Sequence, residues 1–207
     1  MTSPKDELPI ATNKRLLLAS ASPRRLDLLA QIGLVPDEVI PADIDESETP
    51  AEAPRALAAR LARQKAEALR AHLDADTLIL AADTVVGVGR RILPKTETRE
   101  QARACLALLA GRGHRVHTGF SLMSSERIVT KCVTSRVRFK NLSPDEIDSY
   151  LASGEWQGKA GGYAIQGRAS AFITGLVGSY SNIVGLPLYE VSEVLRGAGV
   201  AFETGKE

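Results

Sequence analysis

The 207-residue chain lacks the motifs that mark several common nucleotide and metal sites. It contains no GxxxxGK(S/T), GxGxxG, HExxH or CxxC pattern, which excludes a P-loop, a dinucleotide-binding fingerprint, a zincin site and a paired-cysteine site. Its two cysteines, Cys105 and Cys132, are far apart and share no metal-ligand spacing with each other or with a histidine. We therefore interpret both as reduced thiols in the core.

Aromatic residues, excess charge and long apolar runs are also scarce. Aromatic residues make up 4% of the chain and 26 basic residues nearly balance 25 acidic ones, which argues against a nucleic-acid binder. No stretch approaches the ~18 apolar residues of a membrane-spanning helix, and residues 1–13 have no apolar run of the signal-peptide kind. We expect a cytoplasmic protein that binds neither nucleic acid nor membrane. Residues 1–13 are expected to form a disordered tail before a single domain over residues 14–207.

Short apolar runs alternate with amphipathic helical patterns along the rest of the chain. Thr98 with Gln101, and Ser143 with Glu146, have the spacing of capping boxes that begin helices. We expect strands at 15–20, 77–88 and 171–174, a hairpin between 116 and 139, and helices at 22–33, 54–73, 99–110, 143–154 and 188–196. This alternation predicts an α/β fold with a mixed sheet.

The segment Ser20–Arg25 (SASPRR) stands between the first expected strand and the first expected helix. Free backbone N–H groups, the positive end of the helix and the guanidinium groups of Arg24 and Arg25 would then converge on one spot. Such a spot suits a polyphosphate. A capped helix with two solvated arginines explains the spacing equally well.

Lys65 interrupts an otherwise apolar helical stripe. Leu57, Leu61, Lys65 and Leu69 recur every four residues and so lie on one face of the expected helix. The lysine either extends along that face to the surface, which is the commoner outcome, or points into a polar cleft that holds an anion.

Asp83 is the one acid within the most apolar expected strand, TLILAADTVVGV. It lies either at an exposed strand end, with Thr84 turning the chain, or at a functional site. We favour the functional interpretation because active sites of open α/β sheets gather at strand ends. His114 and His117 are three residues apart on an expected strand, which puts them on opposite faces, and we interpret them as surface or loop residues.

Taken together, these segments resemble the Maf family in sequence and in order. The matching segments are SASPRR at 20–25, Asp45-Glu46, RLARQKA at 60–66, AADTVV at 81–86, Lys95, Gly111 with HRVHTG at 114–119, GKAGGYAIQG at 158–167 and GSYSNIVGLPL at 178–188. One departure is Pro94-Lys95-Thr96, where many members read Gly-Lys-Pro, so that proline fixes φ before the lysine.

The resemblance implies an enzyme that cleaves a nucleoside triphosphate into the monophosphate and pyrophosphate. It also implies an elongated, inosine-triphosphatase-like α/β fold with a mixed sheet flanked by helices, a deep cleft, a divalent cation (Mg²⁺ or Mn²⁺) and a possible homodimer. A nucleotide-binding regulator of cell division that uses the same cleft without turnover is the alternative from another class. Retention of both Asp83 and Lys95 favours the enzyme.

The resemblance also assigns roles to individual residues. Asp83 is implied as the proton acceptor, or as the metal-bound acid that activates water, and Glu46 as a second metal ligand. The triphosphate is implied to be held by Ser20, Arg24, Arg25, Lys65 and Lys95.

Arg24, Thr84 and Gln166 are implied to set the choice of base. We expect dTTP and UTP as substrates rather than 7-methyl-GTP, because the neutral amide of Gln166 can match a thymine or uracil edge but offers no charge to a cationic base. The alternative interpretation of Gln166 is that it only satisfies backbone groups of its glycine-rich loop.

Overall fold

The computed structural model describes residues 14–202, so the disordered tail expected over residues 1–13 lies outside the described residues. The strands are β1 (Arg15–Ala19), β2 (Glu38–Val39), β3 (Thr77–Val88), β4 (Arg91–Leu93), β5 (Gly113–Met123), β6 (Ile128–Phe139) and β7 (Ile173–Val177). The helices are α1 (Pro23–Ala30), α2 (Pro54–Ala68), α3 (Arg99–Leu109), α4 (Pro144–Ala152), α5 (Tyr180–Val184) and α6 (Leu188–Gly197), with short 3₁₀ segments η1 (Arg70–His72) and η2 (Arg168–Phe172).

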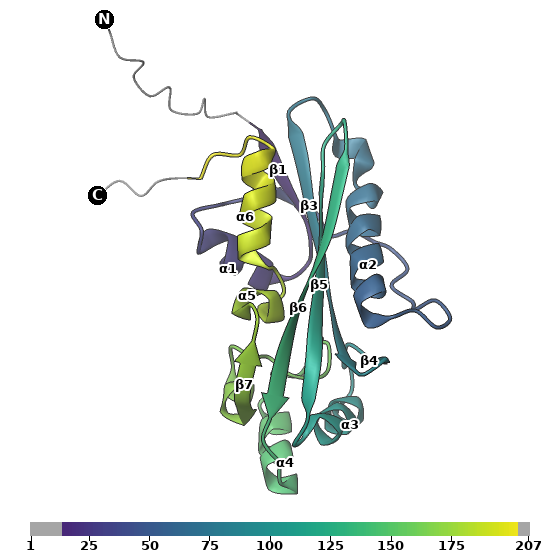
Figure 1. Ribbon diagram of the computed structural model, residues 1–207, viewed down its shortest axis with the longest axis vertical. Coiled ribbons are helices and arrows are strands. Elements are labelled where there is room, and N and C mark those ends of the chain that lie inside the picture. Colours follow the sequence, from purple (N-terminus) through teal and green to yellow (C-terminus); the bar gives the residue numbers. More distant parts are fainter. Residues whose placement is uncertain (1–13, 203–207) are drawn as a thin grey trace, which may run out of the picture.

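The strands form one mixed sheet in the order β2-β1-β3-β5-β6-β7, with β4 paired to β3. β1 runs parallel to β2 and β3, while β3, β5, β6 and β7 pair antiparallel. The long strands β3, β5 and β6 run along the molecule and give it an elongated shape (Figure 1). The expected α/β fold with an elongated mixed sheet is confirmed.

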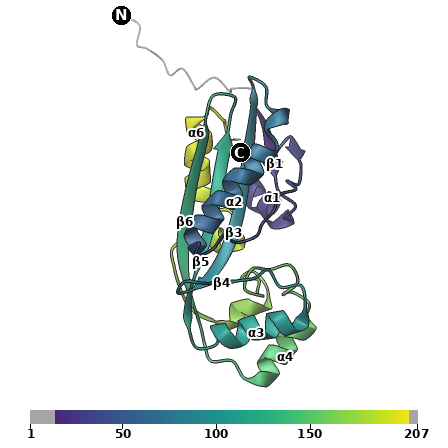
Figure 2. The same ribbon diagram turned by 90° about the vertical axis from the view of Figure 1, so that its right-hand side faces the viewer.

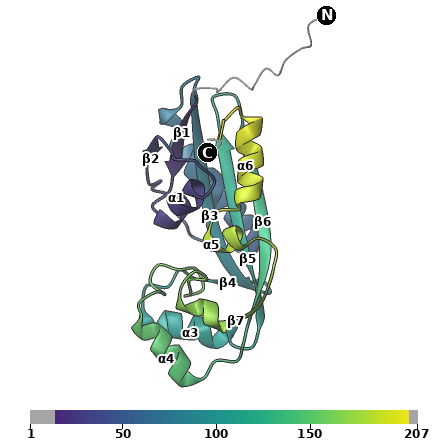
Figure 3. The ribbon, with the colours of Figure 1, turned by 90° about the vertical axis from the view of Figure 1, so that its left-hand side faces the viewer.

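Helices cover both faces of the sheet. α2 lies over one face, and α1 and α6 lie over the other, while α3 and α4 pack together beyond β4 (Figures 2 and 3). Leu16 and Leu18 of β1 face the core under α1 and α6, whereas Leu17 and Ala19 face the core under α2. Burial on both faces explains why this strand reads as an unbroken apolar run.

Gly119 of β5 allows α2 to approach the sheet closely. A Cβ atom there would lie 2.1 Å from the carbonyl oxygen of Ala58 in α2, which no side chain could tolerate. Gly119 is also the cross-strand partner of Asp83. The absence of a side chain beside Asp83 therefore sets the distance between α2 and the centre of β3.

Several details of the fold differ from the expectations. His114 and His117 are not surface residues, since only 2% and 7% of each is exposed. The sequence interpretation was wrong because helices and loops cover both faces of β5, and each imidazole finds a hydroxyl partner, on Tyr163 and Thr134 respectively. Cys105 is buried as expected, but Cys132 lies on β6 outside the part that pairs with β7 and is only half-buried; both are free thiols.

The boundaries of the elements were mostly foreseen. Both capping boxes are present, at Thr98 with Gln101 and at Ser143 with Glu146. Residues 171 and 172 belong to η2, so the strand expected at 171–174 begins later, at Ile173. The short elements β2, β4 and α5 were not foreseen. Within residues 14–202, no helix is both long enough and apolar enough to cross a membrane.

Candidate functional site

The turn between β1 and α1 holds Arg25 in a fixed position. The Arg25 guanidinium donates from Nη1 to Ser20 Oγ at 2.9 Å and from Nε to the Gly185 carbonyl at 2.9 Å. Burial lowers the pKa of Arg25, an effect that the nearby Asp83 carboxylate opposes. Ser22 occupies the N-cap position of α1, but its hydroxyl makes no cap bond, and its backbone N–H donates to Ser20 Oγ instead. The turn thus holds Arg25 as a buried cation and leaves Arg24 partly exposed.

Lys65 does not extend to the surface. It is 7% exposed, and its ammonium lies 2.6 Å from Asp83 Oδ1 and 2.6 Å from Glu46 Oε1. Lys95 also pairs with Glu46 and lies 3.9 Å from Asp83 Oδ1. Two lysines and two carboxylates therefore meet in one cluster, in which Asp83 is almost completely buried.

The electrostatics of this cluster favour the ionised form of Glu46. Burial raises the pKa of Glu46, but hydrogen bonds and charge from Lys65 and Lys95 outweigh it and bring the pKa to about 2. Burial also lowers the pKa of Arg24. At neutral pH Glu46 is anionic and Arg24 is still cationic, because an arginine stays protonated in proteins.

Two cavities meet at this cluster. The first, which we call the cationic lobe, is lined by Ser20, Glu46 and Lys65. The second, which we call the inner lobe, is lined by Asp83, Thr84 and Gln166. The residues common to both lobes are Ser22, Arg24, Arg25, Lys95, Gly158 and Lys159. The structure therefore brings together, in one joined cleft, every residue to which the family resemblance assigns a role.

The glycine-rich loop holds Lys95 in place. Residues 94–96 pair with this loop through backbone bonds from Thr96 N to the Lys159 carbonyl (3.1 Å), from Gly158 N to the Thr96 carbonyl (2.8 Å) and from Gly161 N to the Pro94 carbonyl (3.0 Å). Pro94 contributes only its carbonyl, so its missing N–H leaves no partner unsatisfied. Thr96 is fully buried and donates from Oγ1 to the Trp156 carbonyl at 2.7 Å. The Pro-Lys-Thr departure is thus accommodated.

Two residues that the sequence did not single out also line the cleft. Lys159 lines both lobes, and burial together with the charge of Arg24 lowers its pKa. Tyr163 lines the inner lobe, and its hydroxyl lies 2.8 Å from His114 Nε2. Both belong to the glycine-rich segment, where a lysine and a tyrosine among glycines were the available signal.

The acidic residues fit a cation that is shared with a phosphate ligand. Among residues 14–202, no three His, Cys, Asp or Glu side chains gather as a complete protein-made metal site. Glu46 and Asp83 do meet, since both bond to the same lysine ammonium. Mg²⁺ in nucleotide sites typically uses one or two carboxylates and takes its other ligands from phosphate and water. The donor set therefore suits Mg²⁺ or Mn²⁺ held jointly with a polyphosphate.

The cleft joins a cationic lobe to an inner lobe beside Asp83, a buried acid of the mixed sheet. These features define an α/β protein built to bind a small polyphosphate compound. The fold is similar to that of a HAM1 protein from Coxiella burnetii, with a TM-score of 0.50, 16% sequence identity, and coverage of 89% of this chain and 99% of that one. Residues 15–198 match the family described as Maf-like protein, and the chain belongs to this family.

Relatives in several bacteria match over nearly their whole length. The dTTP/UTP pyrophosphatase of Maricaulis maris is 59% identical over 192 residues, which cover 92% of this chain and 91% of that protein. The dTTP/UTP pyrophosphatase of Caulobacter vibrioides is 56% identical over 191 residues, covering 92% of this chain and 98% of that protein. That of Mesorhizobium japonicum is 55% identical, covering 90% and 92%.

Proposed function

We propose that this protein is a nucleoside triphosphate pyrophosphatase that hydrolyses dTTP and UTP to the monophosphate and pyrophosphate. The observation that carries the proposal is the position of Asp83, which lines the inner lobe and bonds to Lys65 of the cationic lobe. The names of the relatives at 55–59% identity support the same substrates.

The cationic lobe is suited to the triphosphate. Arg24, Arg25, Lys65 and Lys95 provide four positive charges for a ligand that carries about four negative charges. Glu46 and Asp83 balance two of these charges in the free protein. Ser20 Oγ accepts from Arg25 and from the Ser22 N–H, so it holds that guanidinium in place and keeps its own hydroxyl proton to donate to a phosphate oxygen.

Asp83 is suited to take a proton from the attacking water. The water oxygen forms a bond to the α-phosphorus, the bond from the α-phosphorus to the bridging oxygen breaks, and pyrophosphate leaves with that oxygen. The proton of the water passes to the Asp83 carboxylate. Lys65 holds Oδ1 of this carboxylate, and the neighbouring cations offset the charge that develops on pyrophosphate.

Glu46 and Asp83 are the residues that would hold the divalent cation, Mg²⁺ or Mn²⁺. When bound, the cation neutralises phosphate charge and makes water more acidic. Lys65 and Lys95, which pair with these carboxylates in the free protein, are the groups placed to exchange a carboxylate partner for a phosphate oxygen.

The inner lobe is suited to the base. Gln166 presents one amide acceptor and one donor group, which matches the alternation of N–H and carbonyl on thymine and uracil. Arg24 and Thr84 line the same lobe.

We further propose that the enzyme is cytoplasmic, that its partner is the nucleotide and not a nucleic acid, and that it forms a homodimer. Light scattering of the purified protein tests whether it is a dimer.

The test is release of pyrophosphate from dTTP, UTP, CTP and 7-methyl-GTP, each with Mg²⁺ and with Mn²⁺. We expect release from dTTP and UTP that depends on the cation. Release from 7-methyl-GTP alone contradicts the proposed base, and nucleotide binding without release from any of the four supports the non-catalytic alternative.

A further inference from the structure

Two threonine hydroxyls meet across the sheet at the wall of the inner lobe. Thr84 of β3 and Thr118 of β5 are cross-strand partners, and their Oγ1 atoms are 2.9 Å apart. Thr118 is fully buried, whereas Thr84 is partly exposed and lines the inner lobe. The Thr118 hydroxyl also lies 2.7 Å from the backbone carbonyl oxygen of Asn182 in α5.

Counting protons fixes the direction of both hydrogen bonds. A backbone carbonyl can only accept, so Thr118 must donate its single hydroxyl proton to Asn182. The Thr118 oxygen can then act only as an acceptor toward Thr84, and Thr84 must be the donor in the bond between them. The Thr84 proton therefore points into the sheet, and its oxygen presents only lone pairs to the inner lobe.

Thr84, Thr118 and the Asn182 carbonyl thus form a relay of two hydrogen bonds. The Asn182 carbonyl, which sets its direction, is held firmly. The Asn182 side chain is fully buried and donates to the Val116 carbonyl at 3.2 Å and to Ser135 Oγ at 3.0 Å. Its backbone N–H donates to the Ser179 hydroxyl at 3.2 Å. Bonds on both sides of the residue keep its carbonyl facing Thr118, so the direction of the relay does not depend on a mobile group.

We propose that Thr118 is a positioning residue that makes Thr84 an obligatory hydrogen-bond acceptor and so selects a base with a ring N–H. Uracil and thymine carry this donor at N3, whereas cytosine has a lone pair there. A lone pair opposite the Thr84 oxygen leaves both groups without a partner, and a site with buried polar groups discriminates strongly against such a ligand. This inference rests on the proposed function and explains how the same site distinguishes UTP from CTP.

The test compares kcat/KM for UTP and CTP in the unaltered protein, Thr118→Val and Thr118→Ser. Valine keeps the shape and removes the acceptor, which frees the Thr84 hydroxyl to turn its proton into the cavity. We expect the UTP-to-CTP ratio to fall at least about tenfold in Thr118→Val and to be retained in Thr118→Ser, which keeps the hydroxyl. A purely structural role would lower both rates and leave the ratio unchanged.

Ser121→Ala is the matched control. It removes another buried hydroxyl pair of β5, between Ser121 and Thr130 at 2.8 Å, which lines neither lobe. We expect it to leave the UTP-to-CTP ratio unchanged. An unchanged ratio in folded Thr118→Val that still hydrolyses UTP overturns the proposal.

A second measurement needs no variant at Thr118. The unaltered protein should cleave 3-deaza-UTP, in which C–H replaces the ring N–H and the C4 oxygen becomes a hydroxyl, at least about tenfold less efficiently than UTP. Equal efficiency overturns the proposal even where Thr118→Val does not fold. Pyrophosphate release from UTP and dTTP by the unaltered protein is measured before any variant is made. Absence of release is a separate outcome, which refutes the proposed function.

Discussion

The ammonium of Lys65 lies 2.6 Å from a carboxylate oxygen of Asp83, and both side chains are buried. The pair joins α2 to the middle of β3 at the place where the two lobes of the cleft meet. A buried ion pair contributes little net stability, because the cost of removing both charges from water offsets their attraction. A charged pair at this depth is therefore better explained by function than by stability.

Asp83→Asn should abolish turnover while the protein stays folded. The amide keeps the volume of the side chain but cannot take a proton from water, and loss of general-base help alone costs at least about a hundredfold in kcat. The measurement is pyrophosphate release from dTTP, with circular dichroism and the melting temperature as controls for folding. Turnover within about threefold of the unaltered protein contradicts the role assigned to Asp83.

Lys65→Met should lose both activity and stability. The substitution leaves the Asp83 carboxylate buried without its nearest cation, and breaking a buried pair in this way costs about 3 kcal/mol of unfolding free energy. The double variant Lys65→Met with Asp83→Asn removes both charges and should recover most of that stability but no activity. Urea unfolding measures the difference, and equal stability of Lys65→Met and the unaltered protein contradicts the pairing.

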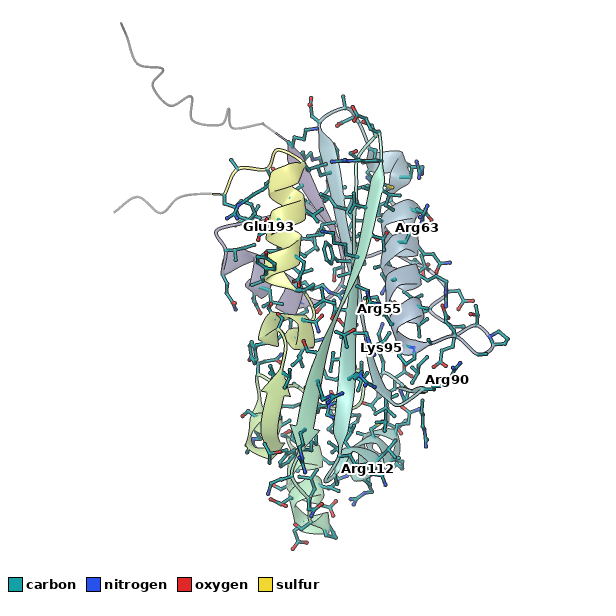
Figure 4. All side chains as sticks on the ribbon, in the orientation of Figure 1. Arg55, Arg63, Arg90, Lys95, Arg112 and Glu193 are labelled. Atoms are coloured by element: carbon teal, nitrogen blue, oxygen red, sulfur yellow. The ribbon has the colours of Figure 1, made fainter. Side chains whose placement is uncertain are left out.

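Arg24→Ala and Lys95→Ala should each weaken catalysis by about a hundredfold or more, because each removes a charge from the lobe that we propose for the triphosphate. Arg90→Ala is the matched control. Figure 4 shows Arg90 projecting outward beside the β3–β4 turn. Lys95, in contrast, pairs with Glu46 and lines both lobes of the cleft. We expect Arg90→Ala to change kcat/KM for dTTP by less than about threefold. Equal losses in all three variants would place the triphosphate elsewhere.

The sequence predicted the longer strands and helices, and the family resemblance named the residues that the cleft brings together. The four-residue stripe identified Lys65 as unusual, and the apolar surroundings did the same for Asp83. Neither pattern could show that the two side chains meet, because that contact depends on how closely α2 approaches Gly119. The burial of His114 was missed for a related reason, since its partner Tyr163 lies 49 residues away in an irregular loop.

His114 should make stability depend on pH in a defined window. Burial lowers its pKa to about 4, below the value of about 6.5 expected in the unfolded chain. The unfolded state therefore binds more protons between these values, so the stabilisation is complete above about pH 6.5 and is lost as the pH falls toward 4. The full effect is about 3 kcal/mol at most.

His114→Gln keeps a hydrogen-bonding group beside Tyr163 but does not titrate, so urea unfolding of this variant should show a weaker loss of stability between pH 7 and pH 4.5. The exposed His72, replaced in the same way, is the control and should leave the pH dependence as it is. If the unfolding free energy changes with pH equally in His114→Gln and in the unaltered protein, His114 is not the source of the pH dependence.

The choice of base should depend on the charge of residue 166. Gln166 lines the inner lobe with Arg24 and Thr84, and its amide is neutral. We expect the unaltered protein to prefer dTTP and UTP over 7-methyl-GTP by at least about tenfold in kcat/KM, and Gln166→Glu to lose that preference. Gln166→Ala serves as a control that removes the hydrogen-bonding group without adding charge.

Electrostatic interactions with the base favour this outcome. A methylated guanine carries a positive charge, and the inner lobe already contains the cations Arg24, Arg25 and Lys95, while its Asp83 is paired with Lys65. A further cation would therefore be desolvated there without an anion of its own. A glutamate at position 166 supplies that anion. With thymine and uracil, however, the carboxylate can accept from only one ring N–H and is repelled by the carbonyl oxygens on either side of it. The substitution should therefore raise kcat/KM for 7-methyl-GTP and lower it for dTTP. If Gln166 only satisfies its own loop, both substrates will lose efficiency in parallel in Gln166→Glu and Gln166→Ala, and the base must be recognised by other residues of the inner lobe.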